Sequence, residues 1–137
     1  MSGSVTYYDG TTIRANTAGT AGQVLVSQGT SAPIFQTEGL QPYAFSTIVS
    51  ATPYVVGTEY FIPVDTSTIA ITVQLPDAPT AGQVFIVKDA AGNSSANNIT
   101  VTTVGGTVNI DGGTSFTIST NWQAVQFIFN GTLYYSF

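Results

Sequence analysis

The sequence contains no histidine and no cysteine, and only two of its 137 residues, Arg14 and Lys88, are basic. The chain therefore lacks the commonest general base, the commonest transition-metal ligands and every thiol nucleophile. Two isolated cations cannot neutralise a row of phosphates, which excludes nucleic-acid binding driven by charge. The composition argues against an enzyme, and it predicts neither a cofactor nor a metal site.

Charge of either sign is scarce. Charged residues make up 7% of the chain, against about 25% of an ordinary soluble domain. Disorder does not explain this, because hydrophobic residues reach 43% and the polar remainder is mostly Ser, Thr, Asn and Gln. Threonine and β-branched apolar residues are abundant, whereas Leu, Glu and Lys are rare. This balance predicts an all-β protein.

Long apolar runs are also missing, and none approaches the length of a membrane span. The first residues, Met1 to Asp9, have neither the basic nor the apolar region of a secretory signal. We therefore expect no insertion into a membrane.

The first part of the chain differs from the rest in being rich in Gly, Ser, Thr and Ala. Its apolar clusters Val24–Val26 and Ile34–Phe35 flank a turn-rich tip, Ser27–Pro33, which predicts a small hairpin. Such a hairpin is marginal alone in water and needs another surface, either the following domain or identical copies. We expect an N-terminal shaft or oligomerisation segment over 1–41 and one domain over 42–137.

Beyond this boundary, strand-like runs alternate with turn signals. The predicted strands are Tyr43–Val49, Glu59–Val64, Ile69–Leu75, Gln83–Lys88, Ile99–Val104, Val108–Ile110, Ser115–Ser119, Trp122–Phe129 and Leu133–Phe137. The alternation is cleanest at Ile69–Leu75, whose four apolar residues share one face. Short strands with turns roughly every 8–12 residues predict an antiparallel β-sandwich, similar to a jelly roll.

Two segments near the C-terminus make sharper predictions. Trp122–Phe129 carries apolar residues on both faces, so it is either central in a sandwich or packed against another chain. Asn130 and Gly131 lie between apolar runs and predict a hairpin with a type I′ turn, which needs positive φ at both residues.

Acidic and aromatic side chains are the candidates for chemistry. Asp65, Asp77, Asp89 and Asp111 each fall at a turn, which favours backbone capping over a Ca²⁺ site or an acid pair. Lys88 ends a strand, as solvated edge residues do. Candidate platforms for a stacked sugar are Trp122, Tyr54, Tyr134 and Tyr135, although burial in a β core is the commoner fate of aromatic residues.

The long polar loop Asp89–Asn98 contains no large side chain, so its tip can adapt to a partner. An ordinary connecting loop is the equally supported alternative. The candidate partner-contact residues are Asp89, Asn93, Ser94, Ser95, Asn97 and Asn98.

Two stretches resemble virion fibre proteins. Gly19–Gln36 resembles a short segment that recurs in phage tail fibres, with Gly-Gln-Val-Leu, a Gly-rich turn, and Pro before an apolar residue. The runs from Tyr54 to Gly131 resemble the β-rich distal domains of fibres of phages, giant viruses and virophages. The segments concerned are Tyr54–Val56, Ile71–Pro79, Gly82–Asp89, Asn98–Thr102, Val108–Gly112 and Val125–Gly131.

This resemblance implies a homotrimeric protein at the virion surface, with a short shaft and a β-sandwich head that attaches to a host or partner-virus surface. The implied partners are copies of the chain, a host-surface receptor, for which a glycan is one candidate, and other virion proteins. The resemblance supplies no catalytic residue.

A carbohydrate-binding β-sandwich module is the competing hypothesis, and it is the same object if the receptor is a glycan. A row of exposed Trp or Tyr favours the module, whereas buried aromatics with polar loops favour a fibre scaffold. A glycan depolymerase ranks third, because it needs two carboxylates within about 5–10 Å of each other in a cleft.

Overall fold

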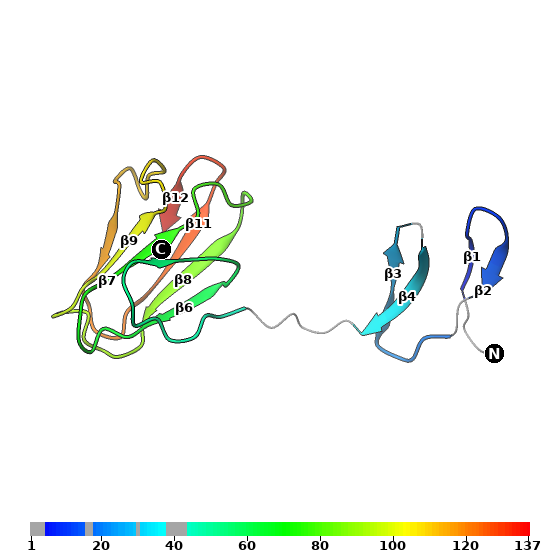
Figure 1. Ribbon diagram of the computed structural model, residues 1–137, viewed down its shortest axis with the longest axis horizontal. Coiled ribbons are helices and arrows are strands. Elements are labelled where there is room, and N and C mark those ends of the chain that lie inside the picture. The colour runs from blue at the N-terminus through cyan, green and yellow to red at the C-terminus, as the bar shows by residue number, and fades with distance from the viewer. Residues whose placement is uncertain (1–4, 16–17, 30, 38–43) are drawn as a thin grey trace. The chain divides into compact units, whose positions relative to one another are not determined.

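The computed structural model describes residues 5–15, 18–29, 31–37 and 44–137, and within them all regular structure is β, as predicted. The strands are β1 (Thr6–Tyr8), β2 (Ile13–Ala15), β3 (Gln23–Gln28), β4 (Ser31–Thr37), β5 (Tyr54–Val55), β6 (Phe61–Val64), β7 (Ile71–Leu75), β8 (Val84–Asp89), β9 (Ile99–Thr103), β10 (Phe116–Ile118), β11 (Ala124–Phe129) and β12 (Tyr134–Ser136) (Figure 1). This part of the chain holds no helix that could cross a membrane.

The chain divides into two compact units, Met1–Pro42 and Tyr43–Phe137, called here the N-terminal and C-terminal units. The sequence-based boundary falls one residue earlier, within a stretch that lies outside the described residues. The N-terminal unit consists of two antiparallel hairpins, β1–β2 and β3–β4. The second is the hairpin expected from the sequence, with Val26 opposite Ile34, and its register shifts between Val26 and Gln28.

The C-terminal unit contains two four-stranded sheets, in the orders β10-β9-β7-β5 and β12-β11-β8-β6 (Figure 1). The prediction of purely antiparallel pairing is wrong, because β5–β7, β7–β9 and β6–β8 are parallel pairs. The reason lies in the connections. From β5 to β9 the chain alternates between the two sheets, and each strand in the other sheet serves as the crossover that a parallel pair requires.

The core of the C-terminal unit is built from every second residue of its strands. Buried and half-buried residues alternate along β7, β8 and β9 and from Val125 to Phe129 in β11. The pattern at Ile69–Leu75 predicts this alternation except at Ile69, which precedes β7 and is 43% exposed. Both sheets contribute to one hydrophobic cluster, Val73 and Val101 from the first and Phe85 and Phe127 from the second.

Most of the predicted strands are one or two residues shorter in the structure, and three differ in other ways. Tyr43 lies outside the described residues, and the rest of 43–49 forms only bridges from Phe45 to Phe61 and from Val49 to Val64. Phe45 and Val49 are four residues apart, whereas their partners Phe61 and Val64 are three apart. The two bridges therefore do not belong to one continuous ladder. In Val108–Ile110, which has turns on either side, only Ile110 forms bridges, to Gly113 and to Tyr134. The predicted strand Trp122–Phe129 begins later than expected, at Ala124.

The hairpin at Asn130–Gly131 joins β11 to β12 as predicted, but the type I′ assignment is wrong. Only Gly131 has a positive φ, of 104°. The connection is longer than two residues, because the Asn130 side chain accepts hydrogen bonds from the N–H groups of Thr132 (2.8 Å) and Leu133 (2.9 Å). This side-chain turn replaces the expected backbone turn.

Candidate functional site

One end of the C-terminal unit combines the predicted contact loop with the turn that precedes β11. The Ser94 hydroxyl donates to the Thr120 carbonyl at 2.7 Å, and the Ser95 N–H donates to Oδ1 of Asn121 at 2.8 Å. Residues about 26 positions apart in the chain therefore form one continuous surface. We call it the Trp122 surface; it consists of the exposed residues Asn93, Ser95, Asn121 and Trp122.

The carboxylate of Asp89 holds this surface together from beneath. Asp89 is the last residue of β8 and is fully buried. It accepts five hydrogen bonds, from the Thr66 hydroxyl (2.7 Å) and from the backbone N–H groups of Ala91 (3.2 Å), Gly92 (2.9 Å), Ser94 (3.1 Å) and Trp122 (3.0 Å). Loop and turn are thus fixed to one charged group.

These hydrogen bonds decide the ionisation of Asp89. Burial alone would raise the pKa of its carboxyl group, but the Thr66 hydroxyl and the N–H groups of Trp122, Ser94 and Gly92 outweigh burial and hold the pKa far below its ordinary value. A general acid in a glycosidase needs a raised pKa and access to substrate. Asp89 has neither property, and its geometry is that of a structural anchor.

Thr66 extends the anchoring to the rest of the loop. Its hydroxyl accepts a hydrogen bond from the Asn93 N–H at 3.1 Å, and its carbonyl accepts one from Nδ2 of Asn97 at 2.8 Å. Thr66 is buried and lies 23 residues before Asp89. Sequence reasoning did not identify it, because a threonine after a strand is indistinguishable from the many others in this chain.

The six predicted contact residues therefore divide into two groups. Asp89 and Ser94 are buried and cannot face a partner, so their inclusion as contact residues was wrong. Asn97 is half-buried and bonded to Thr66. Exposed members of the loop are Asn93, Ser95 and Asn98. Contact between this loop and a partner stays a prediction, carried by the exposed members.

Trp122 departs most from expectation. The sequence favoured a buried residue at the start of a strand, whereas the structure places it in a turn with 61% of its surface exposed. Its φ is +63°, a left-handed conformation that costs a bulky residue about 1–3 kcal/mol. Its N–H donates to Asp89, and its carbonyl accepts a hydrogen bond from the Lys88 ammonium. Tertiary contacts therefore impose a backbone conformation that the local sequence disfavours.

The indole ring is positioned by two neighbours. Gly92 has a φ of +74°, and a Cβ atom there would lie 2.2 Å from Cε2 of Trp122, so only glycine leaves room for the ring. The Lys88 ammonium lies 5.8 Å from the ring centroid, in the range of a cation–π interaction. The Lys88 ammonium therefore contacts both the backbone carbonyl and the ring of Trp122, and Lys88 is more than a solvated edge residue.

The other candidate aromatic platforms are placed differently. Tyr134 is fully buried and donates to the Pro76 carbonyl at 2.7 Å, while half-buried Tyr54 donates to Glu59 at 2.6 Å. Tyr135 is 49% exposed and pairs with Ile128, six positions along the chain from Trp122. At about 3.3 Å per residue, this places Tyr135 roughly 20 Å from Trp122, so the two do not form an adjacent row.

The remaining predicted carboxylates lie at turns, as expected. Asp65 accepts from the Ser67 N–H (2.9 Å) and so caps a local donor. Asp77 accepts from the N–H of Gly105 (2.8 Å) and Asp111 from that of Ser136 (3.1 Å), which lie 28 and 25 residues away, so the prediction of local capping is wrong for these two. Across the described ranges no group of three or more His, Cys, Asp or Glu residues is placed to hold a metal ion.

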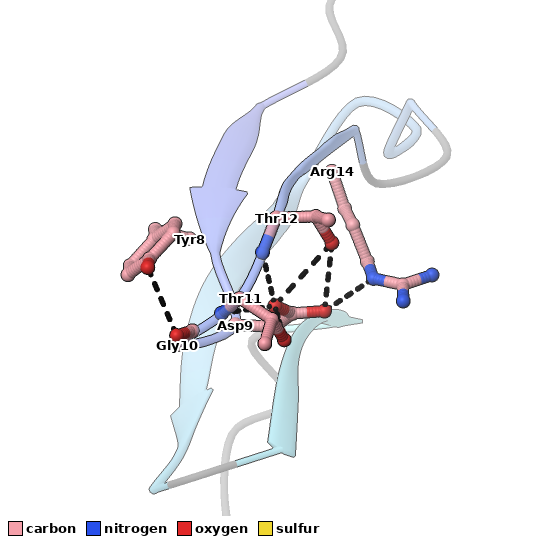
Figure 2. A network of polar contacts seen from close by, with 6 residues as sticks. All are labelled: Tyr8, Asp9, Gly10, Thr11, Thr12 and Arg14. Carbon is pink, nitrogen blue, oxygen red and sulfur yellow. Dashed lines mark hydrogen bonds and ion pairs between the residues drawn. The ribbon is translucent and has the colours of Figure 1, made fainter.

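A second polar network lies in the N-terminal unit, at the turn between β1 and β2 (Figure 2). The Asp9 carboxylate accepts from the N–H groups of Thr11 (2.9 Å) and Thr12 (2.8 Å) and pairs with Arg14. The hydrogen bond from the Thr12 N–H, followed by that from Arg14, lowers the pKa of Asp9. The Tyr8 hydroxyl donates to the Gly10 carbonyl at 2.9 Å. These bonds all fall within eight residues and stabilise the turn.

A cleft of about 470 Å³ adjoins this turn. It is lined by Tyr7, Tyr8, Asp9, Gly10, Ser27, Gly29, Ser31 and Pro33, so both N-terminal hairpins contribute to it. The Asp9 carboxylate is engaged by its own turn, and we assign no chemistry to the cleft. Comparison with protein-family models and with curated proteins found no match.

Proposed function

We propose that this chain is a non-enzymatic attachment protein of a virus particle, fibre-like in organisation and homotrimeric. In this proposal residues 1–41 form an oligomerising shaft segment, and residues 42–137 form a β-sandwich head. The head presents the Trp122 surface to a host or partner-virus surface. The resemblance of Gly19–Gln36 to tail-fibre segments supports the assignment to a virion.

The observation that carries the proposal is the unequal burial of the two units. Every buried hydrophobic residue in the described ranges belongs to the C-terminal unit. The N-terminal unit instead exposes Tyr8, Ile13, Val24, Leu25 and Ile34, with exposed fractions from 38% to 78%. A segment of about 40 residues without a core does not stay folded alone. It requires covering by another protein surface.

The β3–β4 hairpin favours three copies over two. Val26 and Ile34 form a pair on one face, while Leu25 and Phe35 form a pair on the other. Both faces are apolar and incompletely covered. A two-fold dimer covers one self-complementary patch, whereas a closed ring joins two different patches of each chain, and the smallest such ring is a trimer.

Two features of the C-terminal unit support a sandwich head. Its four-stranded sheets share one hydrophobic cluster, which is the arrangement of two facing layers. It also carries a partly covered apolar row, in which exposed Phe45 is paired with half-buried Phe61, and Phe61 with half-buried Ile86. Phe45 is 73% exposed, so this row offers the trimer a second contact in the head.

Light scattering of the full chain after size exclusion tests the proposal. We expect a mass about three times the 14.3 kDa of one chain. Leu25→Asn should lower this mass, because it places an amide on an apolar face of the hairpin. Val104→Asn changes a residue of similar exposure (47%, against 41% for Leu25) in the C-terminal unit and should leave the mass unchanged. A monomeric wild-type protein at micromolar concentration would contradict the proposal.

A carbohydrate-binding module is the second candidate function, and the exposed indole of Trp122 favours it. Light scattering also separates the two candidates: a monomer that binds glycans is a module, whereas a trimer that binds them is an attachment protein whose receptor is a glycan.

A further inference from the structure

We propose that the Trp122 surface binds a pyranose ring of a glycan, with the sugar stacked on the indole of Trp122. This inference rests on the proposed attachment function and identifies the chemical class of its receptor. It uses three properties of the surface: the fixed position of the ring, the chemistry of its surroundings, and the rigidity of the loop beside it.

The indole ring is held in place even though it is exposed. Trp122 keeps 61% of its surface accessible. Its backbone N–H donates to Asp89, its backbone carbonyl accepts from Lys88, and its ring lies against Gly92. Its positive φ shows that this position is maintained against the local preference of the backbone. Such conformations persist where the surroundings enforce them, and they concentrate at binding sites.

The surroundings of the ring match the edge of a sugar. Asn93 adjoins Gly92 in the chain and Asn121 adjoins Trp122, and both asparagines are exposed. The amide oxygen of Asn121 accepts a hydrogen bond from the N–H of the exposed Ser95. A pyranose has an apolar face of C–H groups and a rim of hydroxyls. Aromatic side chains pack against the apolar C–H face, and amide and hydroxyl side chains form hydrogen bonds with the hydroxyl rim. The carboxylate beneath the surface, Asp89, is buried and does not compete for the hydroxyls.

Other partners fit this surface less well. A protein-interaction hot spot places its Trp among residues that exclude water, whereas the neighbours of Trp122 are small and polar. A nucleic-acid strand would need a groove of cations, and Lys88 is the only basic residue of the C-terminal unit.

The rigidity of the loop lowers the entropic cost of binding. Asp89 and Thr66 bind the backbone at Gly92, Asn93 and Ser94, next to the exposed side chains. The surface is therefore organised before a ligand arrives. This lowers the cost of binding and helps a small ligand that makes few contacts with the protein.

Because Trp122 is the only tryptophan, its fluorescence reports on this site without a label. The full-length protein should be screened on a glycan array and then titrated with soluble oligosaccharides such as chitohexaose, cellohexaose, mannohexaose and an oligouronate. We expect at least one to shift the emission saturably. Tyr135→Asn removes another exposed aromatic of this unit and should leave both the array pattern and the titration unchanged.

Trp122→Asn is the decisive variant, because asparagine tolerates a positive φ and preserves the turn while removing the indole. We expect at least a tenfold loss of glycan binding on the array, with the oligomeric state and thermal midpoint retained. Equal glycan binding by Trp122→Asn and wild type would overturn this inference and leave the attachment function standing. A trimer that binds no glycan would also overturn it, whereas a monomer would overturn the attachment proposal itself.

Discussion

Both units of the chain contain strands with apolar side chains, yet among the described residues only the C-terminal unit buries them fully. In the C-terminal unit, β7 faces a second sheet and its Ile71, Val73 and Leu75 are almost completely buried. In the N-terminal unit, β3 has one partner strand, and Val24 and Leu25 remain 38% and 41% exposed. A strand therefore needs a second layer as well as a neighbour.

This difference separates two sources of stability. The C-terminal unit contains its own core, so its free energy of unfolding should depend only weakly on protein concentration. The N-terminal unit depends on apolar contacts that other copies supply, so its order should depend on concentration. The following predictions test this division and then the construction of the Trp122 surface.

The largest effect should follow removal of a core ring from the C-terminal unit. Phe127 is fully buried and packs edge-to-face on Phe116 at 5.5 Å between centroids. Phe127→Ala should lower the free energy of unfolding by about 3–5 kcal/mol, measured by urea denaturation. Leu25→Ala, in the N-terminal unit, should leave this transition unmoved. Similar losses from both variants would show that the two units are not independent.

An intermediate effect should follow removal of the Asp89 charge. Asp89→Asn keeps the shape but weakens five hydrogen bonds, and it should cost about 2–3 kcal/mol at pH 7. The lowered pKa of Asp89 means that its contribution is fully present above the ordinary Asp pKa of about 4 and is lost as the pH falls below it.

The thermal midpoint measured from pH 7 down to pH 2 tests this sign. The wild type should lose stability in acid, and Asp89→Asn should lose less over the same interval. Asp65→Asn alters a half-buried residue directly after β6, whose pKa is also lowered by hydrogen bonds from Ser67, and it should change the profile less than Asp89→Asn does. An Asp89→Asn profile parallel to that of wild type would exclude Asp89 as the main acid-sensitive group.

The smallest effect should come from the glycine beneath the indole. Gly92→Ala introduces a side chain at a φ of +74° and 2.2 Å from the Trp122 ring. Gly106→Ala is the matched control, because Gly106 has a φ of +64° and nothing within 4 Å of its Cβ position. Both should lose about 1 kcal/mol or more through backbone strain. Only Gly92→Ala should also shift the Trp122 emission; an unchanged spectrum would contradict the assigned packing.

Much of the fold could be predicted from alternation. The patterns at Ile71–Leu75 and Ile99–Thr103 indicate both the strands and their buried faces, because burial on one side imposes a period of two. Strand direction could not be predicted, because alternation is the same for parallel and antiparallel pairs. The two-residue β5 is too short to give a pattern, and its pairing with β7 defines it.

The candidate site could be predicted only in outline. The length and polarity of the loop after Asp89 mark it in the sequence, and a turn role for Asp follows from its chemistry. The exposure of Trp122 could not be deduced, since it depends on hydrogen bonds to Asp89 and Lys88, more than 30 residues away. Local sequence suggested a strand there, and tertiary contacts overrode it.

The alternation of β5 to β9 between the two sheets also constrains how the C-terminal unit can come apart. Neither sheet corresponds to a continuous stretch of chain, because each strand from β5 to β8 is followed by one that belongs to the other sheet. Peeling one sheet away would pull on every connection to the other. We therefore expect the two sheets of the C-terminal unit to unfold together, as one cooperative unit.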